Sequence, residues 1–321
     1  FASTDLTQTA TVSVTQEAAG PAFPSQWIFS ASTVGQYNTP WSVSNMLPAT
    51  SGSSGYISVV HGEANAGREF TRTVSSYKPA VSTMVEGDYW LYTLPVKRLE
   101  AGTAVEFDAT MAGEANSPKY FIVEYLDGGV WKSVEEDLLT APEDPSIRYT
   151  YKCSGTATGS GYQHASVMQT VRFTDPVEGA VQIRCRAVGR YTCSGGTQNI
   201  SASSSANLLP PFGFSGSYVQ NLGTAIPGDT KKVLCLGNSF SYYSNPAWML
   251  KEIAWNEGHY LNVKGHFKGS QNFGQHLELS FSTDAIDIGG YDYAFIQDQS
   301  QNPATYGRDG TASIAANCTA L

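Results

Sequence analysis

The feature that most constrains the fold is residues 231–241, where an apolar run ends abruptly in small and polar residues. The run 233–236 has the length of a buried strand, and Gly237 lets the backbone turn directly after it. An Asn-Pro pair then opens a segment with a helical pattern over 246–257. This order places Ser239 just beyond the C-terminal end of a strand, where open α/β sheets bind their ligands.

The segments that follow continue the same alternation. Residues 259–267 predict a second strand, 269–281 a weak helix and 291–296 a third strand. Strand, helix, strand, helix, strand is the pattern of a parallel sheet covered by helices. We therefore expect residues 229–321 to form part of a three-layer α/β domain of the flavodoxin type.

The preceding part of the chain has a different pattern, with short alternating runs separated by turn residues. Asp127-Gly128-Gly129 between two β-rich runs is a strong hairpin signal. No long segment of helical period interrupts these runs, so an all-β sandwich or jelly roll is predicted. The predicted strands are 27–30, 56–60, 69–75, 89–94, 103–112, 119–126, 130–134, 147–153, 166–173, 180–188 and 199–202.

A length of 321 residues favours two domains over one. We place the sandwich at 19–205 and the α/β domain at 229–321, with a linker at 206–228 that packs along the boundary through its apolar residues. Residues 1–18 end in an alternating run that looks like the last strand of an immunoglobulin-like BACON-type module. A first strand of the sandwich is the alternative.

Composition excludes several classes of function. A formal net charge of −9 without a basic run argues against nucleic acid and anionic membrane surfaces as partners. No stretch has the roughly 20 apolar residues that span a bilayer. The five cysteines lack metal-ligand spacing, so we expect neither a metal nor another cofactor. Cys153 forms a disulfide with Cys185 or Cys193, or these thiols stay free and buried.

Only 15% of the residues are charged, while Ser, Thr, Gly and aromatic residues are plentiful. This balance is typical of exported β-rich proteins, and we expect a secreted, periplasmic or cell-surface location. The chain starts at Phe1 without a signal peptide, which we interpret as a mature or truncated form.

The stretch Gly237-Asn238-Ser239-Phe240-Ser241 resembles the first motif of the SGNH, or GDSL-type, serine esterases, Gly-Asp-Ser-X-Ser, with Asn238 in place of the Asp. The resemblance covers roughly residues 229 to 321. It implies ester hydrolysis through an acyl-serine intermediate, with Ser239 as the nucleophile. An acylated glycan is the substrate class that the resemblance suggests, and removal of acetyl groups is the reaction.

The same resemblance assigns the oxyanion hole. Its donors are the amide of Ser239, the amide of Gly269 after the second strand, and a side chain after the third strand. The family has Asn there in Gly-X-Asn-Asp, whereas this chain has Gln297-Asp298-Gln299-Ser300, so the motif departs at both the Gly and the Asn. Gln299 is the first candidate for this donor and Gln297 the second.

Three further residues are candidates for lining the pocket: Asn238, Ser300 and His276. For His276, a structural or surface role is the alternative to substrate contact. The Asp-X-X-His motif that supplies the base in SGNH enzymes occurs nowhere in the 321 residues. We therefore expect an incomplete hydrolase domain, and little activity in this chain by itself.

The alternative function is that of a non-catalytic glycan-binding or adhesive surface protein. The stretch 120–131 resembles accessory modules of secreted carbohydrate-active proteins, and aromatic side chains can stack on sugar rings. Trp41, Trp90 and Trp131 are the candidates for such a platform. Burial of these rings in the core is the competing interpretation.

Overall fold

The structure is a computed structural model, and it describes the greater part of the chain between residues 25 and 298. The described residues are 25–27, 47–49, 51–52, 55–63, 72–75, 78–82, 84–135, 138–153, 163–198, 205–208, 212–219, 231–238, 240–241, 246–256, 259, 261–268 and 271–298. The alternating run within residues 1–18 and the predicted strand 199–202 lie outside them.

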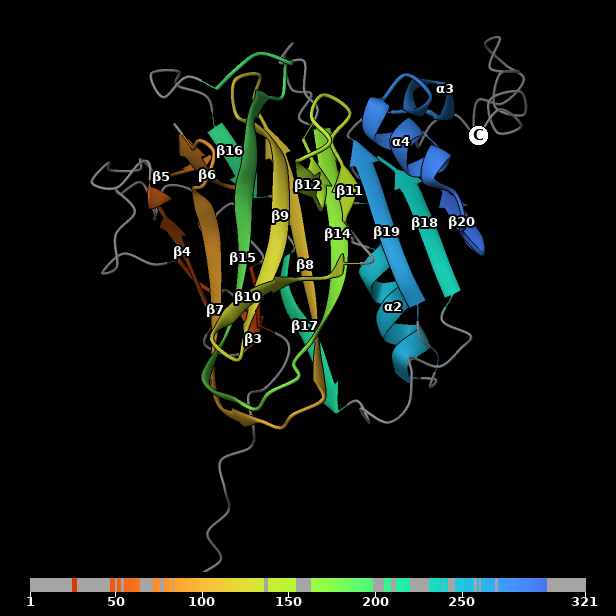
Figure 1. The fold of residues 1–321 in the computed structure, drawn as a ribbon. Helices are drawn as coiled ribbons and strands as arrows, with labels where there is room; N and C mark the ends of the chain where they lie inside the picture. Colours follow the sequence, from red (N-terminus) through yellow and green to blue (C-terminus); the bar gives the residue numbers. More distant parts are fainter. Residues whose placement is uncertain are drawn as a thin grey trace, which may run out of the picture.

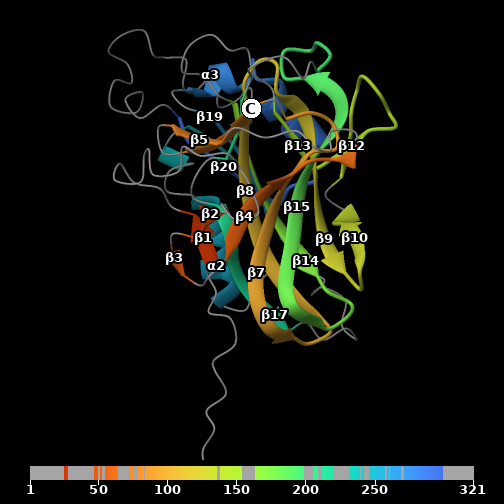
Figure 2. The ribbon, with the colours of Figure 1, turned by 90° about the vertical axis from the view of Figure 1, so that its left-hand side faces the viewer.

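Two large sheets face each other in the N-terminal part of the chain (Figures 1 and 2). The first sheet has the strand order β10-β9-β15-β7-β4-β2, with β13 beside β9. Its strands are β2 Leu47–Pro48, β4 Tyr56–Val60, β7 Tyr89–Leu99, β9 Pro118–Asp127, β10 Val130–Ser133, β13 Tyr151–Lys152 and β15 Val177–Thr192. The Asp-Gly-Gly stretch forms the predicted hairpin, in which Val130 pairs with Asp127.

The second sheet has the order β20-β18-β19-β14-β8-β16-β6-β5, with β17 also on β8 and with β1 and β3 beyond β17. These strands are β1 Ser25–Trp27, β3 Ser51–Gly52, β5 Arg72–Ser75, β6 Lys78–Ser82, β8 Thr103–Gly113, β14 Gln163–Arg172, β16 Ser205–Leu208, β17 Phe212–Val219, β18 Lys231–Gly237, β19 Leu261–Lys268 and β20 Tyr293–Ile296. A separate small pair consists of β11 Leu139–Thr140 and β12 Arg148–Tyr149.

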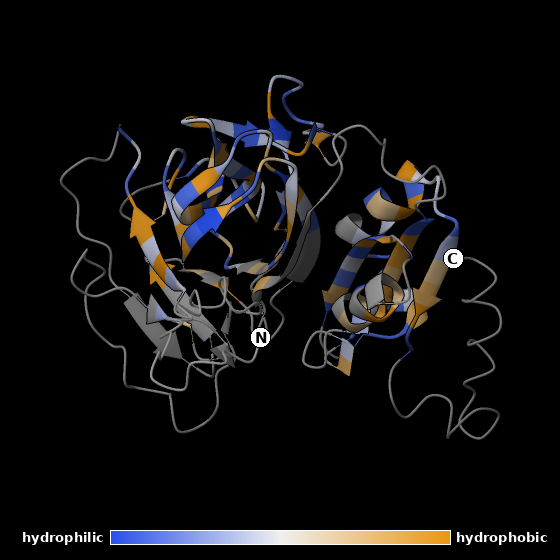
Figure 3. Ribbon diagram, turned by 90° about the horizontal axis from the view of Figure 1, so that it is seen from below, coloured by the Kyte–Doolittle hydropathy of each residue, from blue (hydrophilic) through white to orange (hydrophobic). Residues whose placement is uncertain are grey.

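The main core lies between the two sheets. Every second residue of β15 from Val181 to Cys185 is buried, which is the period that places one face of a strand inward. In Figure 3, hydrophobic and hydrophilic residues alternate along the strands. Tyr92 of one sheet meets Phe107 of the other edge to face, with ring centroids 4.8 Å apart. The described residues are thus mostly β-strand, and the predicted β-sandwich is confirmed.

Two predictions in this part need correction. Trp90, a candidate for an exposed platform, is fully buried in the core, because its position in β7 points inward. The segment 206–228, predicted as a linker, instead supplies most of β16 and the whole of β17, which pair with β8. Its Ser, Gly and Pro residues resemble those of a linker, but Leu208 and Phe214 are fully buried in the sandwich core.

The three strands β19, β18 and β20 form a parallel group with β18 in the middle. Helix α2, Pro246–Asn256, joins β18 to β19. The short α3, Phe273–His276, and α4, Ser280–Ile288, join β19 to β20. Helix α2 packs on the face that carries Val233 and Cys235, and α4 packs on the face that carries Leu234 and Leu236. Right-handed crossovers in opposite directions require helices on opposite faces, as observed.

The parallel group and the sandwich share one sheet (Figure 1). Strand β14 pairs antiparallel with β8 on one side and with β19 on the other. Two ion pairs reinforce the junction: Lys251 of α2 with Glu106 of β8, and Lys152 of β13 with Asp284 of α4. Within the described ranges, no helix is long and apolar enough to cross a membrane.

Candidate active site

The carboxyl ends of β18, β19 and β20 are held together by one side chain, that of Asn238. Asn238 follows β18 directly and is buried, with 2% of its surface exposed. Its Nδ2 donates to the carbonyl of Asp298, after β20, at 3.0 Å, and to the carbonyl of Gln271, after β19, at 3.4 Å. Its Oδ1 accepts from the amide of Phe240 at 3.1 Å. Asn238 therefore fixes three chain segments at the point where the strand order reverses.

This bonding pattern gives a physical reason for Asn, and not Asp, at position 238. A carboxamide carries both a donor group and an acceptor, whereas an ionised carboxylate only accepts. A carboxylate at position 238 would face two carbonyl oxygens with no proton to offer. The surroundings of position 238 offer two carbonyl acceptors and one amide donor, and an asparagine side chain satisfies all three.

Gly237 and Ser241 make the turn after β18 compact. Ser241 is buried, and its amide donates to the carbonyl of Asn238 at 3.0 Å. A Cβ on Gly237 would overlap with the hydroxyl of Ser241 and would lie 3.1 Å from Oε1 of Gln297. Only glycine therefore fits at position 237 while Ser241 folds back over it.

Gln297 is positioned by the end of β20. Its amide donates to the carbonyl of Leu236 at 2.8 Å, and its Oε1 accepts a hydrogen bond from the hydroxyl of Ser241. Oε1 is thereby held, while Nε2 of Gln297 donates to no described residue. Asp298 is buried and accepts from the amide of Phe273 at 3.0 Å, which fixes the start of α3.

His276 lies beneath this arrangement. It is fully buried, and its Nδ1 is 3.0 Å from the hydroxyl of Ser282. Burial lowers its pKa to about 4, although the nearby backbone of Gly237 and the charge of Asp298 act in the opposite direction. Nε2 has no hydrogen-bond partner of normal geometry among the described residues. The ring is therefore neutral near pH 7.

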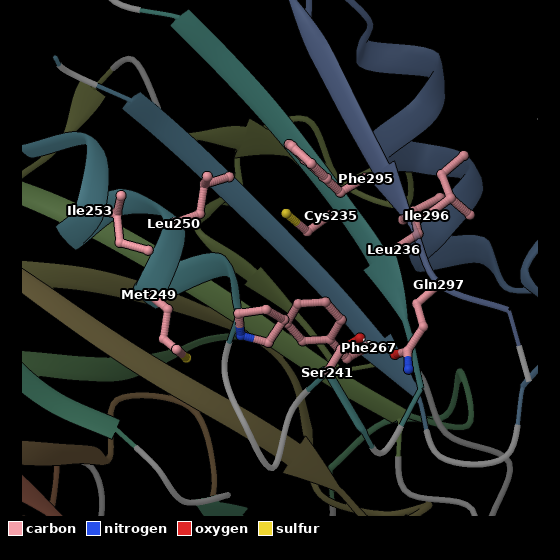
Figure 4. A pocket seen from close by; sticks show the side chains of 11 residues that line it. Cys235, Leu236, Ser241, Met249, Leu250, Ile253, Phe267, Phe295, Ile296 and Gln297 are labelled. Carbon is pink, nitrogen blue, oxygen red and sulfur yellow. Dashed lines mark hydrogen bonds between the residues drawn. The ribbon is translucent and has the colours of Figure 1, made fainter. Parts of the chain in front are cut away.

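An apolar pocket of about 440 Å³ opens beside the strand ends, over the face of the sheet that α2 covers (Figure 4). Ser241 and Gln297 form its polar end. Its apolar lining comes from β18, α2, β19 and β20: Cys235, Leu236, Pro246, Met249, Leu250, Ile253, Phe267, Phe295 and Ile296. Burial raises the pKa of Cys235 to about 12, so this lining residue is a neutral thiol. The pocket can accept an apolar group.

The residues proposed for the active site fall into two groups. The structure brings Asn238 and Gln297 to the same strand ends and places His276 behind them, outside the pocket lining. Ser239, Gly269, Gln299 and Ser300 lie outside the described residues. Ser241 was not among the residues predicted for the site, although it lies in the same Gly-Asn-Ser-Phe-Ser stretch. Among the described residues, no cluster of His, Cys, Asp or Glu has the arrangement of a metal site.

A second polar cluster lies on the outer face of the first sheet, opposite the core. Glu124 of β9 accepts from Nε of Arg184 at 2.6 Å and from two nitrogens of Arg186 at 2.7 and 2.9 Å. Both arginines are on β15. Although burial acts to raise the pKa of Glu124, the two guanidinium groups outweigh it and hold the pKa below its usual value.

Two aromatic rings flank this cluster. The guanidinium carbon of Arg184 lies 4.2 Å from the ring centroid of Trp131 and 5.2 Å from that of Tyr89. Trp131 and Tyr89 are both half-buried. Trp131 was a candidate from the sequence, whereas the two arginines were not. Their signal is their alternation with buried residues in the stretch 182–187.

Comparison with known proteins assigns the chain to no family. No model of a known protein family matches the chain, and no curated protein matches it. One similar solved structure is described as "CBM4 structure and function", with 12% identity over 56% of this chain and 96% of that chain, and a TM-score of 0.30.

Two further solved structures are similar over part of their length. Xylanase10C from Cellvibrio japonicus in complex with xylopentaose has 11% identity over 64% of this chain and 36% of that chain, with a TM-score of 0.24. The enzymatically active domain of tailspike protein 4 from bacteriophage CBA120 has 12% identity over 59% of this chain and 21% of that chain, with a TM-score of 0.22. At these TM-scores the similarities carry no argument about fold or function.

Proposed function

We propose that the parallel group belongs to a serine esterase of the SGNH type, with Ser239 as its nucleophile. The observation that carries the proposal is the position of Asn238, whose side chain joins the ends of β18, β19 and β20 next to Ser239 in the sequence. Open α/β sheets bind ligands where the strand order reverses, and β18 lies between its two parallel neighbours there.

The proposed reaction is ester hydrolysis in two steps. The hydroxyl oxygen of Ser239 attacks the ester carbonyl, and the alcohol leaves with a proton. Water then attacks the acyl-serine and releases the acid. The negative charge on the carbonyl oxygen needs preorganised donors, for which we propose the amides of Ser239 and Gly269 and a glutamine side chain.

The glutamine donor is either Gln299 or Gln297. The hydrogen bond from Ser241 to Oε1 of Gln297 orients that carboxamide and leaves its Nε2 available, which supports Gln297. Because removal of one oxyanion donor costs about 10²- to 10³-fold in kcat, alanine substitution of each glutamine separates them. The residue whose substitution causes such a loss is the donor.

His276 is a poor candidate for the general base that Ser239 needs. His276 is fully buried, and a pKa near 4 makes it a weak proton acceptor, so we assign it a structural role. A serine without its base retains little activity. We therefore propose low turnover for this 321-residue chain by itself. The acylated glycan as substrate rests on analogy with proteins that join a β-sandwich to an esterase domain, and the secreted, periplasmic or cell-surface location rests on composition.

Hydrolysis of p-nitrophenyl acetate tests the esterase. We expect slow release of p-nitrophenol by the wild-type chain, and loss of this activity in Ser239→Ala. The half-buried Ser58 lies in the sandwich, so Ser58→Ala is the matched control and keeps the wild-type rate. Activity that survives Ser239→Ala would remove Ser239 from the mechanism.

A second candidate function, glycan binding by the outer face of the first sheet, is favoured by the cluster around Arg184. The rings of Trp131 and Tyr89 hold its guanidinium group, whose terminal nitrogens donate to no described residue. A planar guanidinium can donate two parallel hydrogen bonds to neighbouring hydroxyls, while aromatic rings contact the apolar faces of sugars.

Affinity electrophoresis in gels that contain xylan, β-glucan or a polyuronate tests this candidate. We expect retardation by at least one polysaccharide and its loss in Trp131→Ala and Arg184→Ala. Val130→Ala is the control, since Val130 is an exposed neighbour in the same hairpin. Equal mobility of all variants in every gel would exclude the face as a glycan site.

A further inference from the structure

Two of the five cysteines, Cys153 and Cys193, meet at one end of the sandwich. Cys153 directly follows β13, and Cys193 directly follows β15. Both are buried, with 1% and 8% of their surfaces exposed. Both are free thiols in this structure, and each acts on the pKa of the other. They are distant in sequence, so the fold itself brings them together.

The backbone holds both cysteines against the same short segment at the start of β9. The amide of Cys153 donates to the carbonyl of Lys119 at 2.7 Å, and the amide of Cys193 donates to the carbonyl of Ser117 at 3.0 Å. The sulfur of Cys193 also lies 3.3 Å from the hydroxyl of Ser117 and 3.3 Å from the carbonyl of Pro118.

Gly113 of β8 leaves room for the two side chains. The position that a Cβ would take on Gly113 is 2.6 Å from the sulfur of Cys193 and 3.4 Å from the Cβ of Cys153. Any larger residue at 113 would collide with the hydroxyl of Ser117 and the sulfur of Cys193. Both side chains thus converge on the space above a single glycine.

The two thiols differ chemically. Contact with Cys153, and after it the hydrogen bond from Ser117 and the charge of Lys119, lowers the pKa of Cys193 despite its burial. Contact with Cys193, together with full burial, raises the pKa of Cys153. Cys193 is therefore the thiol that ionises first, and thiolates are the attacking species in thiol–disulfide exchange.

We propose that Cys153 and Cys193 form a disulfide that ties the end of β13 to the end of β15. The oxidant is an external disulfide, either a small-molecule disulfide or that of a thiol oxidoreductase. The Cys193 thiolate attacks it, which forms a mixed disulfide and releases one thiol. The Cys153 thiol then loses its proton and attacks the Cys193 sulfur, which releases the second thiol. Two cysteine thiols are oxidised and one external disulfide is reduced.

The linkage closes a long loop that includes β14 and β15. Cross-linking such a loop restricts the unfolded chain and stabilises the folded one. Cys185 provides the contrast, because it lies within β15 and its pKa is set by burial and by Glu124 and Tyr92, with no second cysteine among the groups that act on it. Of the two partners that the sequence left open for Cys153, the structure therefore favours Cys193 over Cys185, while all three thiols are free in this structure.

Cysteine counting by mass spectrometry tests the proposal. The full chain is refolded in a mixture of oxidised and reduced glutathione, denatured and alkylated with N-ethylmaleimide. We expect three of the five cysteines to be alkylated before reduction and all five after it. Peptide mapping without reduction then identifies a Cys153–Cys193 peptide pair in the wild-type protein.

Variants and stability complete the test. Cys185→Ser, at an equally buried position, keeps the linkage, whereas Cys193→Ser loses it. Reduction of the wild-type protein lowers the thermal midpoint by about 5–15 °C. Five alkylated cysteines before reduction, or a linkage of Cys153 to any other cysteine, would overturn the proposal. If Cys193→Ser does not fold, peptide mapping of the wild-type protein still shows whether Cys153 is linked to Cys193.

Discussion

At the scale of single residues, Asn238 shows how one carboxamide can define a strand-end site, and Asn238→Asp tests this directly. The carboxylate would face the carbonyls of Asp298 and Gln271, so we expect a loss of about 1–3 kcal/mol in the free energy of unfolding at pH 7. The loss should shrink at low pH, where a protonated carboxyl regains a donor. Urea unfolding at pH 7 and pH 4.5 measures both effects.

Asn272→Asp is the control for this substitution. Asn272 is the N-cap of α3, and its side chain accepts from the amide of Gln275 at 2.9 Å. A carboxylate performs that role as well as a carboxamide, so this variant should keep wild-type stability. Equal destabilisation by the two substitutions would contradict the role assigned to the Nδ2 group of Asn238.

Also at this scale, the buried histidines should make the fold sensitive to acid. Burial lowers the pKa of His276 to about 4 and that of His266 to about 3, against about 6.5 in the unfolded chain. The unfolded chain therefore binds more protons between these values, and stability should rise with pH up to about 6.5 and then level off.

Replacement of His276 isolates its share of this pH dependence. The slope of the unfolding free energy against pH reports how many more protons the unfolded chain binds than the folded one. Between pH 4 and 6.5, this number should be lower in His276→Asn than in the wild type by up to one proton. The urea midpoint, measured at half-unit steps of pH, gives the slope. His259→Asn, at an exposed position, controls for the change of residue type. An unchanged slope in His276→Asn would mean that this histidine is protonated equally in both states.

At the scale of elements, a buried ion pair fastens α2 to the sandwich. The side chains of Lys251 and Glu106 are only 8% and 12% exposed, and Nζ of Lys251 also lies 3.0 Å from the hydroxyl of Thr170. Lys251→Met removes the cation that faces Glu106, so we expect a loss of about 3–5 kcal/mol. The double variant Lys251→Met, Glu106→Leu should lose much less. Urea unfolding of the wild type, Lys251→Met, Glu106→Leu and the double variant gives the coupling energy between the two side chains. If the losses of unfolding free energy in the two single variants add up to the loss in the double variant, the two side chains do not form a direct pair.

The sequence predicted most elements, because their signals are local. Alternation along β15 and the Asp-Gly-Gly turn between β9 and β10 depend only on neighbouring residues. The strands β16 and β17 were missed because a Ser-, Gly- and Pro-rich composition has the same local pattern in an inner strand as in a linker. At the site, the sequence placed Gln297 correctly, because it directly follows the predicted strand that became β20. The bonds of Asn238 to Gln271 and Asp298 join segments far apart in the chain, which no local pattern reveals.

At the scale of the whole molecule, the pairing of β14 with β19 makes one sheet out of two predicted domains. Ser166 pairs with Thr110 of β8 and with Gly265 of β19, so the same strand belongs to the sandwich and to the parallel group. Loss of β19 would leave the edge of β14 without its partner strand, and unfolding of α2 would remove the cation beside Glu106. We therefore expect β8, β14, β18 and β19 to unfold as one cooperative unit.

Hydrogen exchange read by mass spectrometry at increasing urea tests this coupling. Peptides from β8 and β14 and peptides from β18 and β19 should share one urea midpoint, and Lys251→Met should lower all of them together. Two domains joined only by a tether would behave differently, because their β18 and β19 amides would exchange at a urea concentration that leaves β8 protected. That separation of midpoints would show that the shared sheet does not transmit stability between the sandwich and the proposed esterase site.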